Sequence, residues 1–407
     1  ANTFRWKTWP SVHSVDLPAR SKATSSRLTI SGANWIASSK CHAGSGVINK
    51  GFFDLNRWLT FIRHEVDQFI TIKSVNRPLQ LPFASALAMG GPVLVGAWTH
   101  HLNAGLTASL GALVFLYLPE RSFLDRLRSL TMSVIVMMAC YWFGSLTSIE
   151  RTYQATGLAI VTTMATLYCR AAAVGGPPGS LFFVIAASIG ASSQPIASVS
   201  HNRLGLVFWG CLWGFAVAAF YCLLKPAATS NISLKPAKEL IRRNFANSVL
   251  IGVVVGSSLL LAQWLQLENP YWVPVSCLAV VQGTNFREIW NKQLHRMIGT
   301  TLGLMMISAI FQTPPSSDWQ IAGWIVLFSF AIEMTVTRHY ATAVMFITPM
   351  TILLADAGQA HQSSLWSLAQ SRLTDTAVGC GVGLLGGFIL HAWQANQADE
   401  TQQLKKN

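Results

Sequence analysis

The chain has 407 residues, of which 51 % are hydrophobic and only 11 % are charged. Because soluble domains carry roughly a quarter charged residues, this composition excludes an ordinary soluble domain. It indicates a polytopic α-helical membrane protein in contact with the lipid bilayer. No nucleic-acid motif accompanies the net charge of +13. Lys and Arg collect in the cytoplasmic loops of membrane proteins, so the charge is interpreted as a topology signal and no nucleic-acid partner is expected.

The first 78 residues differ in composition from the rest of the chain. Residues 1–50 are rich in Ser, Lys and Arg and lack a sustained apolar period, which predicts a disordered segment or one extraneous to the working protein. Within residues 51–78, apolar side chains recur at helical spacing from Trp58 to Ile70, and Asp54 can cap the start. This pattern predicts an amphipathic helix along the inner leaflet. The alternative is a soluble helix that packs on a cytoplasmic partner.

The remainder of the chain is a series of apolar runs with brief polar breaks. We predict an all-α membrane protein with about twelve transmembrane helices in two six-helix repeats, at 79–225 and 245–395. A cytoplasmic linker at 226–244 joins them, and a cytoplasmic tail at 396–407 follows. The predicted spans are 82–98, 102–118, 129–147, 152–169, 179–197 and 204–224 in the first set, and 245–265, 271–285, 296–312, 319–337, 341–356 and 373–393 in the second.

Basic residues cluster in alternate loops. The segments "PERSFLDRLRS", "KPAKELIRR", "REIWNKQLHR" and "TRHY" are basic, whereas "QLEN", "QTPPSSD" and "DAGQAHQSS" carry almost no positive charge. By the positive-inside bias, both termini are expected in the cytoplasm.

The two sets resemble each other in sequence. "HNRLGLVFWGCLWG" matches "QSRLTDTAVGCGVG" at constant spacing, and Arg128 and Arg170 precede Arg296 and Arg338 at nearly the same spacing. Because six helices form an even number, both halves would have the same orientation, as a parallel repeat about an axis along the membrane normal. The identities in the matched window place Arg203, Leu204, Gly210, Cys211 and Gly214 on Arg372, Leu373, Gly379, Cys380 and Gly383.

Two motifs in the second set resemble a known family. The first has Tyr-Trp and Pro at a helix start, then an apolar segment, a basic linker and Arg-x-x-Gly-Thr-x-x-Gly. The second is Arg-x-x-Asp-Thr-x-x-Gly near the end of the chain. In both, the chain resembles the FUSC (fusaric acid resistance protein-like) integral membrane transporters; the first half matches only through its repeat relation, with Asn103 and Ala104 in place of Tyr-Trp. The motif residues are Tyr271, Trp272, Pro274, Arg296, Gly299, Thr300 and Gly303, followed by Arg372, Asp375, Thr376 and Gly379.

The resemblance implies a multi-pass transporter of the bacterial inner membrane. The family's members are linked to export of aromatic carboxylic acids, sometimes with a periplasmic adaptor protein, so this chain is expected to export small organic anions. An adaptor or a second copy of the chain would be its protein partner. Plant anion channels of the aluminium-activated malate type share a related membrane domain, so an anion channel is one alternative. A non-transporting membrane scaffold is another.

Two acidic residues within the apolar runs are candidates for proton coupling. Glu333 lies in "FSFAIEMTVTRHY", and Asp375 follows Arg372 by one helical turn. Charged side chains inside a bilayer are costly and mark functional sites, and a carboxyl group at low dielectric tends to bind a proton. For Glu333 the alternative is a structural bridge to an arginine on a neighbouring helix.

Four arginines are candidates for binding the organic anion. Arg203 and Arg372 begin the last helix of each set, on the expected outer side, and Arg170 and Arg338 end the fourth helix of each set, on the inner side. A guanidinium group fits a carboxylate in a bidentate way. The alternatives are an interface anchor for the outer pair and a topology signal for the inner pair. The inner basic residues could also gather anions electrostatically.

Several motifs of enzymes and metal proteins are missing from the sequence. It contains no G-x-x-x-x-G-K-[ST], G-x-S-x-G or H-E-x-x-H motif and no C-x-x-C pair. We therefore expect no enzymatic activity, no metal site and no cofactor. Tyr271 and Trp272 are expected at the membrane interface, where aromatic rings are favoured.

Overall fold

The computed structural model describes residues 63, 71, 78–119, 121–172, 178–192, 200–225, 237–283, 285–312, 317–356 and 365–406. The chain divides after Ile70, and every described residue except Arg63 lies in the second unit. The expectations for residues 1–50, and nearly all of the amphipathic helix predicted at 51–78, lie outside the described residues.

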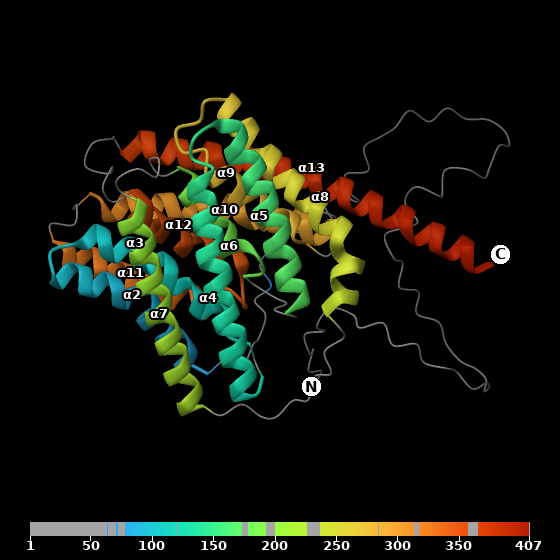
Figure 1. The fold of residues 1–407 in the computed structure, drawn as a ribbon. Helices are drawn as coiled ribbons and strands as arrows, with labels where there is room; N and C mark the ends of the chain where they lie inside the picture. The colour runs from blue at the N-terminus through green and yellow to red at the C-terminus, as the bar shows by residue number, and fades with distance from the viewer. Residues whose placement is uncertain are drawn as a thin grey trace. The chain divides into compact units, whose positions relative to one another are not determined.

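The described residues of the second unit are helical and contain no strand, which confirms the all-α prediction. Twelve α-helices lie where twelve spans were predicted (Figure 1). The first set is α2 (Gln80–Trp98), α3 (Leu102–Ala112) continued by the 3-10 helix η2 (Leu113–Tyr117), α4 (Phe123–Leu146), α5 (Arg151–Ala171), α6 (Leu181–Ser192) and α7 (Ser200–Leu224). The second set is α8 (Ala237–Trp264), α9 (Trp272–Val281), α10 (Phe286–Ile310), α11 (Asp318–Thr335), α12 (Tyr340–Asp356) and α13 (Leu365–Lys406).

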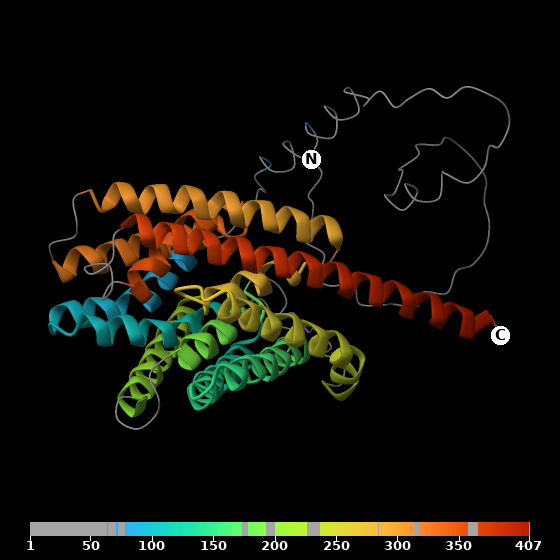
Figure 2. The same cartoon turned by 90° about the horizontal axis from the view of Figure 1, so that it is seen from above.

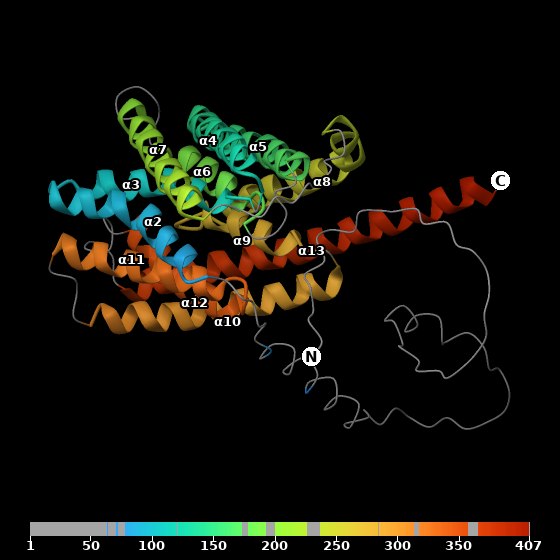
Figure 3. The ribbon, with the colours of Figure 1, turned by 90° about the horizontal axis from the view of Figure 1, so that it is seen from below.

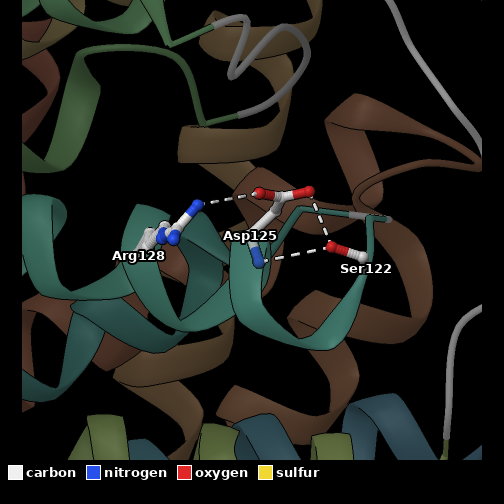
Figure 4. Close-up of polar contacts among 3 residues, drawn as sticks. All are labelled: Ser122, Asp125 and Arg128. Carbon is white, nitrogen blue, oxygen red and sulfur yellow. Dashed lines mark hydrogen bonds and ion pairs between the residues drawn. The ribbon is translucent and has the colours of Figure 1, made fainter.

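Several helix starts differ from the prediction, and polar caps set two of them. The hydroxyl of Ser122 accepts the Asp125 N–H at 3.4 Å and donates to its carboxylate at 2.6 Å, so α4 begins six residues before the predicted span (Figure 4). Asn285 Oδ1 accepts the Glu288 N–H at 2.9 Å and caps α10. The span predicted at 271–285 therefore ends early, because its last residue already belongs to the next helix.

Five of the described helices are long and apolar enough to cross a membrane: α2, α4, α7, α8 and α13. Four others are apolar but shorter, namely α3 with η2, α6, α9 and α12. A crossing by each of the twelve helices therefore remains a prediction. All ten residues of α9 are buried, so this short helix is surrounded by protein. Its apolar side chains contact other helices, and the helix therefore need not be long enough to cross the bilayer.

Helix pairings in the first set recur in the second. Helix α3 packs on α7 as α9 packs on α13, α4 packs on α6 as α10 packs on α12, and α2 packs on α3 as α8 packs on α9. Between the sets, α5 lies along α8 and α2 lies along α11 (Figure 3). The fourth helix of each set thus contacts the first helix of the other.

The helices of the two sets do not share one direction. Figures 1 and 2 show α4 and α5 running steeply across the direction of α10 and α13. A single membrane normal therefore cannot run parallel to both groups, and helices that cross a bilayer in this arrangement must be tilted.

Glycines bring α7 and α13 close to their partners. A Cβ at Gly214 would lie 2.8 Å from the carbonyl oxygen of Ala112 on α3, and one at Gly383 would lie 2.7 Å from that of Cys277 on α9. A Cβ at Gly379 would meet the carbonyl oxygen of Val273. The small residues thus allow backbone-to-backbone packing in both sets.

Leucine at Gly379 is expected to destabilise the protein by about 3 kcal/mol or more, because the helix backbones cannot separate without loosening the core. The measurement is the melting temperature of the purified protein in detergent. Gly381 on the same helix is the matched control, since no atom lies within 4 Å of a Cβ added there. Equal melting temperatures for the two leucine variants would contradict the close packing of α9 and α13.

Candidate functional site

A buried arginine of α13 lies against the first residue of α9. The guanidinium carbon of Arg372 is 3.7 Å from the centre of the Trp272 ring. Arg372 is 7 % exposed and Trp272 is 5 % exposed. A guanidinium group over an indole face forms a cation–π contact, which strengthens as water is excluded. Trp272 is thus covered by protein, and its expected depth at the membrane interface stays a prediction.

Polar side chains from three segments hold this arginine in place. Arg372 Nη2 donates to Thr351 Oγ1 on α12 at 2.6 Å. Asn269, in the loop before α9, donates from Nδ2 to Ser371 Oγ at 3.2 Å. We call Asn269, Trp272, Thr351, Ser371 and Arg372 the Arg372 cluster. Since its members come from three separate segments, only the folded chain brings them together.

The outer arginine of the first set does not form a corresponding cluster. Arg203 is exposed, whereas Arg372 is buried. At the start of α3, Asn103 and Ala104 stand where the second set has Tyr271 and Trp272, so neither position carries an aromatic ring. With no aromatic ring to cover it, Arg203 stays at the surface. The two arginines at matching sequence positions therefore differ in burial, and their roles in anion binding stay predictions.

The inner arginines occupy different environments. Arg170 is half-buried and donates from Nη1 to Asn244 Oδ1 at 3.3 Å, which joins α5 to α8. Arg338 is half-buried in the turn between α11 and α12. Arg128, 79 % exposed, lies 3.9 Å from Asp125 in the first turns of α4 (Figure 4). Its counterpart in the sequence match, Arg296, is 8 % exposed, so the two arginines occupy different environments.

Two further arginines with structural roles were missed by the sequence analysis. Arg121 Nη2 donates to the carbonyl oxygen of Ala172 at 2.8 Å, and Arg126 Nη1 donates to that of Lys225 at 3.2 Å. Both carbonyls lie at the C-terminal ends of helices, where a cation is favoured. Arg121 in the loop before α4 thus caps α5, and Arg126 in the first turns of α4 caps α7. A sequence motif does not reveal this role, because the acceptors lie far along the chain.

The two acidic candidates are both inside the protein. Asp375 is 1 % exposed and Glu333 is 8 % exposed. Helix α13 brings Asp375 next to α9, and α11, which carries Glu333, packs on α2 and α12. Burial of both side chains is what a proton-binding carboxyl group needs, although a buried structural carboxylate has the same property.

Histidines that the sequence analysis did not single out cap α12. His295 Nδ1 accepts the Ala341 N–H at 3.2 Å, and His339 Nδ1 accepts the Thr342 N–H at 3.3 Å. The ring centres of the two histidines are 5.0 Å apart. Their Nδ1 atoms satisfy free N–H groups in the first turn of the helix. Within the described parts of the chain, no group of three or more His, Cys, Asp or Glu side chains is placed to hold a metal ion.

Comparison with known proteins identifies the region that contains the site. Residues 249–386 match the family described as fusaric acid resistance protein-like. The chain is also 29 % identical over 156 residues to an uncharacterized membrane protein, YvaC, of Bacillus subtilis (strain 168), which covers 38 % of this chain and 24 % of that protein. It is 26 % identical over 152 residues to an uncharacterized protein, ORF2, of Neisseria gonorrhoeae, which covers 37 % of this chain and 35 % of that protein. No solved structure matches the chain.

Fold and site together define a helical membrane protein with a buried cationic cluster in its second set of helices. The Arg372 cluster lies within residues 249–386, the part of the chain that matches the fusaric acid resistance protein-like family. The motif resemblance is thereby confirmed. The chain spans about a quarter to a third of the length of the curated relatives that it matches.

Proposed function

We propose that this chain is the membrane part of a secondary transporter that exports small organic anions, including aromatic carboxylic acids. The observation that carries the proposal is the Arg372 cluster, a buried guanidinium group stacked on Trp272 and held by Thr351. In this role the guanidinium donates to the carboxylate of the acid, while the indole contributes an apolar surface that suits an aromatic ring.

The proposed location is the bacterial inner membrane, with both termini in the cytoplasm. The basic loops between alternate helices support this orientation. We further propose that the two sets are parallel repeats, which the recurring helix pairings and the glycines at Gly214 and Gly383 support. A periplasmic adaptor protein or a second copy of the chain is a further proposed partner, which rests on the family resemblance alone.

Export of an anion by a carrier requires a source of energy, which we assign to protons. Glu333 and Asp375 are the proposed proton-binding groups, and their burial in the membrane-embedded helices supports this assignment. Arg170 and Arg338 would then serve to attract anions at the inner face. Arg170 already holds Asn244, so its role in substrate contact is secondary to its role between α5 and α8.

Counterflow in proteoliposomes tests the proposed function directly. Vesicles loaded with unlabelled acid are diluted into radiolabelled acid, and a panel of aromatic and aliphatic acids is compared. A carrier accumulates the label transiently, with faster exchange of the acids that it recognises. Steady electrical current without a proton gradient would instead indicate an anion channel, and neither exchange nor current for any acid would indicate a scaffold.

A further inference from the structure

A second guanidinium group is buried against α9, the short helix whose Trp272 contacts Arg372. Arg296 of α10 is 8 % exposed, and its Nη2 donates to Ser276 Oγ on α9 at 3.2 Å. Ser276 is itself buried, and α13 closes over it, because a Cβ at Gly379 would lie 2.7 Å from the Ser276 Cβ. Arg296 therefore lies between α9, α10 and α13 rather than in the inner basic loop.

The protein supplies little to balance the charge of Arg296. Among the described residues its one hydrogen bond is to a neutral hydroxyl, and its Nε finds no acceptor. Neither the ion pair of Arg128 with Asp125 nor that of Lys292 with Glu288 involves Arg296. A guanidinium group held at low dielectric without a carboxylate is costly, and in a membrane protein such a group marks an ion or substrate contact.

The contacts of Arg296 differ from those of Arg126, a buried arginine with a structural role. Arg126 is buried to the same extent, but its Nη1 reaches the carbonyl oxygen of Lys225 and thereby caps a helix. Arg296 reaches no described backbone carbonyl. Helix capping, which accounts for Arg126, therefore does not account for Arg296.

Arg296 and Arg372 contact the same short helix one turn apart. Ser276 follows Trp272 by four residues, which corresponds to about 6 Å along a helix and to the same helical face. Resting on the proposed function, we infer that Arg296 is a second anion contact, which receives the carboxylate of the transported acid from the Arg372 cluster or delivers it there. The two arginines would then form successive stations on one side of α9, with the side chains of α13 as the opposing wall.

Two measurements on purified full-length variants test this inference, with benzoate as the probe. The first is equilibrium binding of radiolabelled benzoate in detergent, and the second is benzoate counterflow in proteoliposomes. Arg296→Gln is expected to bind benzoate within about threefold of the unmodified protein, yet to exchange it at least about tenfold more slowly, the effect of losing one charge-assisted contact. Arg296→Lys should recover part of the exchange rate. Lys292→Gln, one turn earlier on α10 at a half-buried position paired with Glu288, should behave as the unmodified protein.

The outcomes distinguish the second contact from the proposed function itself. Unchanged exchange by Arg296→Gln would overturn the inference, and the proposed function would stand if Arg372→Gln were impaired. Loss of binding together with exchange in Arg296→Gln would also overturn it, because the residue would then belong to the first site or to the fold. If Arg296→Gln does not fold, the Arg296→Lys variant is measured instead. Lysine keeps the positive charge, so exchange by Arg296→Lys as slow as that by Arg372→Gln would contradict the inferred contact. Normal binding and exchange by Arg372→Gln would instead refute the proposed function.

Discussion

Alanine at Arg372 is expected to slow organic-acid exchange at least about tenfold, whereas alanine at Arg203 leaves it near the original rate. The reason is the difference in burial between the two arginines. A hydrogen bond to a charged group contributes about 1.5–3 kcal/mol, and about 1.4 kcal/mol corresponds to one factor of ten. At Arg203, a carboxylate would be contacted in water, where such a bond contributes far less. The measurement is counterflow in proteoliposomes at equal protein content.

Arg203→Ala is the matched control for this prediction, because it removes the same side chain from the corresponding position of the other set. Both variants should elute as single species in gel filtration and give the same membrane protein yield. Equal exchange by the two variants would contradict a binding site at the Arg372 cluster. Slower exchange in both variants would mean that the exposed Arg203 contributes to transport as the buried Arg372 does.

Glutamine at Glu333 is expected to abolish proton-driven efflux and to leave counterflow intact. Glutamine has nearly the shape of a protonated glutamic acid but cannot release a proton. A carrier with this substitution can therefore exchange one acid for another, but it cannot complete the proton cycle that drives net export. The expected loss in gradient-driven efflux exceeds about tenfold, whereas counterflow stays within about twofold, because the anion contacts are unchanged.

Glu288 provides a control for the loss of one negative charge. Glu288 pairs with Lys292 at 2.9 Å near the start of α10, and Glu288→Gln should retain both efflux and counterflow. Proton-driven efflux at the original rate in Glu333→Gln would remove this residue from the coupling mechanism. Loss of counterflow as well would indicate the structural bridge that the sequence left as the alternative.

The helices themselves were predictable from apolar runs, and the errors lie at their ends. Hydropathy places a boundary where the chain becomes polar, but a helix begins where its first N–H groups find acceptors. Ser122 and Asn285 provide those acceptors within polar loops, so α4 and α10 begin earlier than the apolar runs suggest. Thr351, by contrast, could not be assigned to the site, since nothing in a local pattern pairs it with Arg372.

The pairing of arginines across the two sets illustrates the limit of sequence matching. Arg203 and Arg372 occupy matching sequence positions, yet one is exposed and the other lies over an aromatic ring. The partner helix also differs, because Tyr271 and Trp272 stand in one set and Asn103 and Ala104 in the other. These residues are visible in the sequence, but their contact with the arginines depends on how α13 and α7 pack.

The sequence alone was sufficient for the class of protein, the number of helices, and the family motifs, because these follow from composition, apolar period and local spacing. Tertiary structure decided which charges are buried and what they touch. Arg296, Arg372 and Asp375 lie within the protein because glycines let α13 approach α9 closely. Burial is a property of the packed helices, so an arginine can be exposed in one set and buried at the matching sequence position of the other.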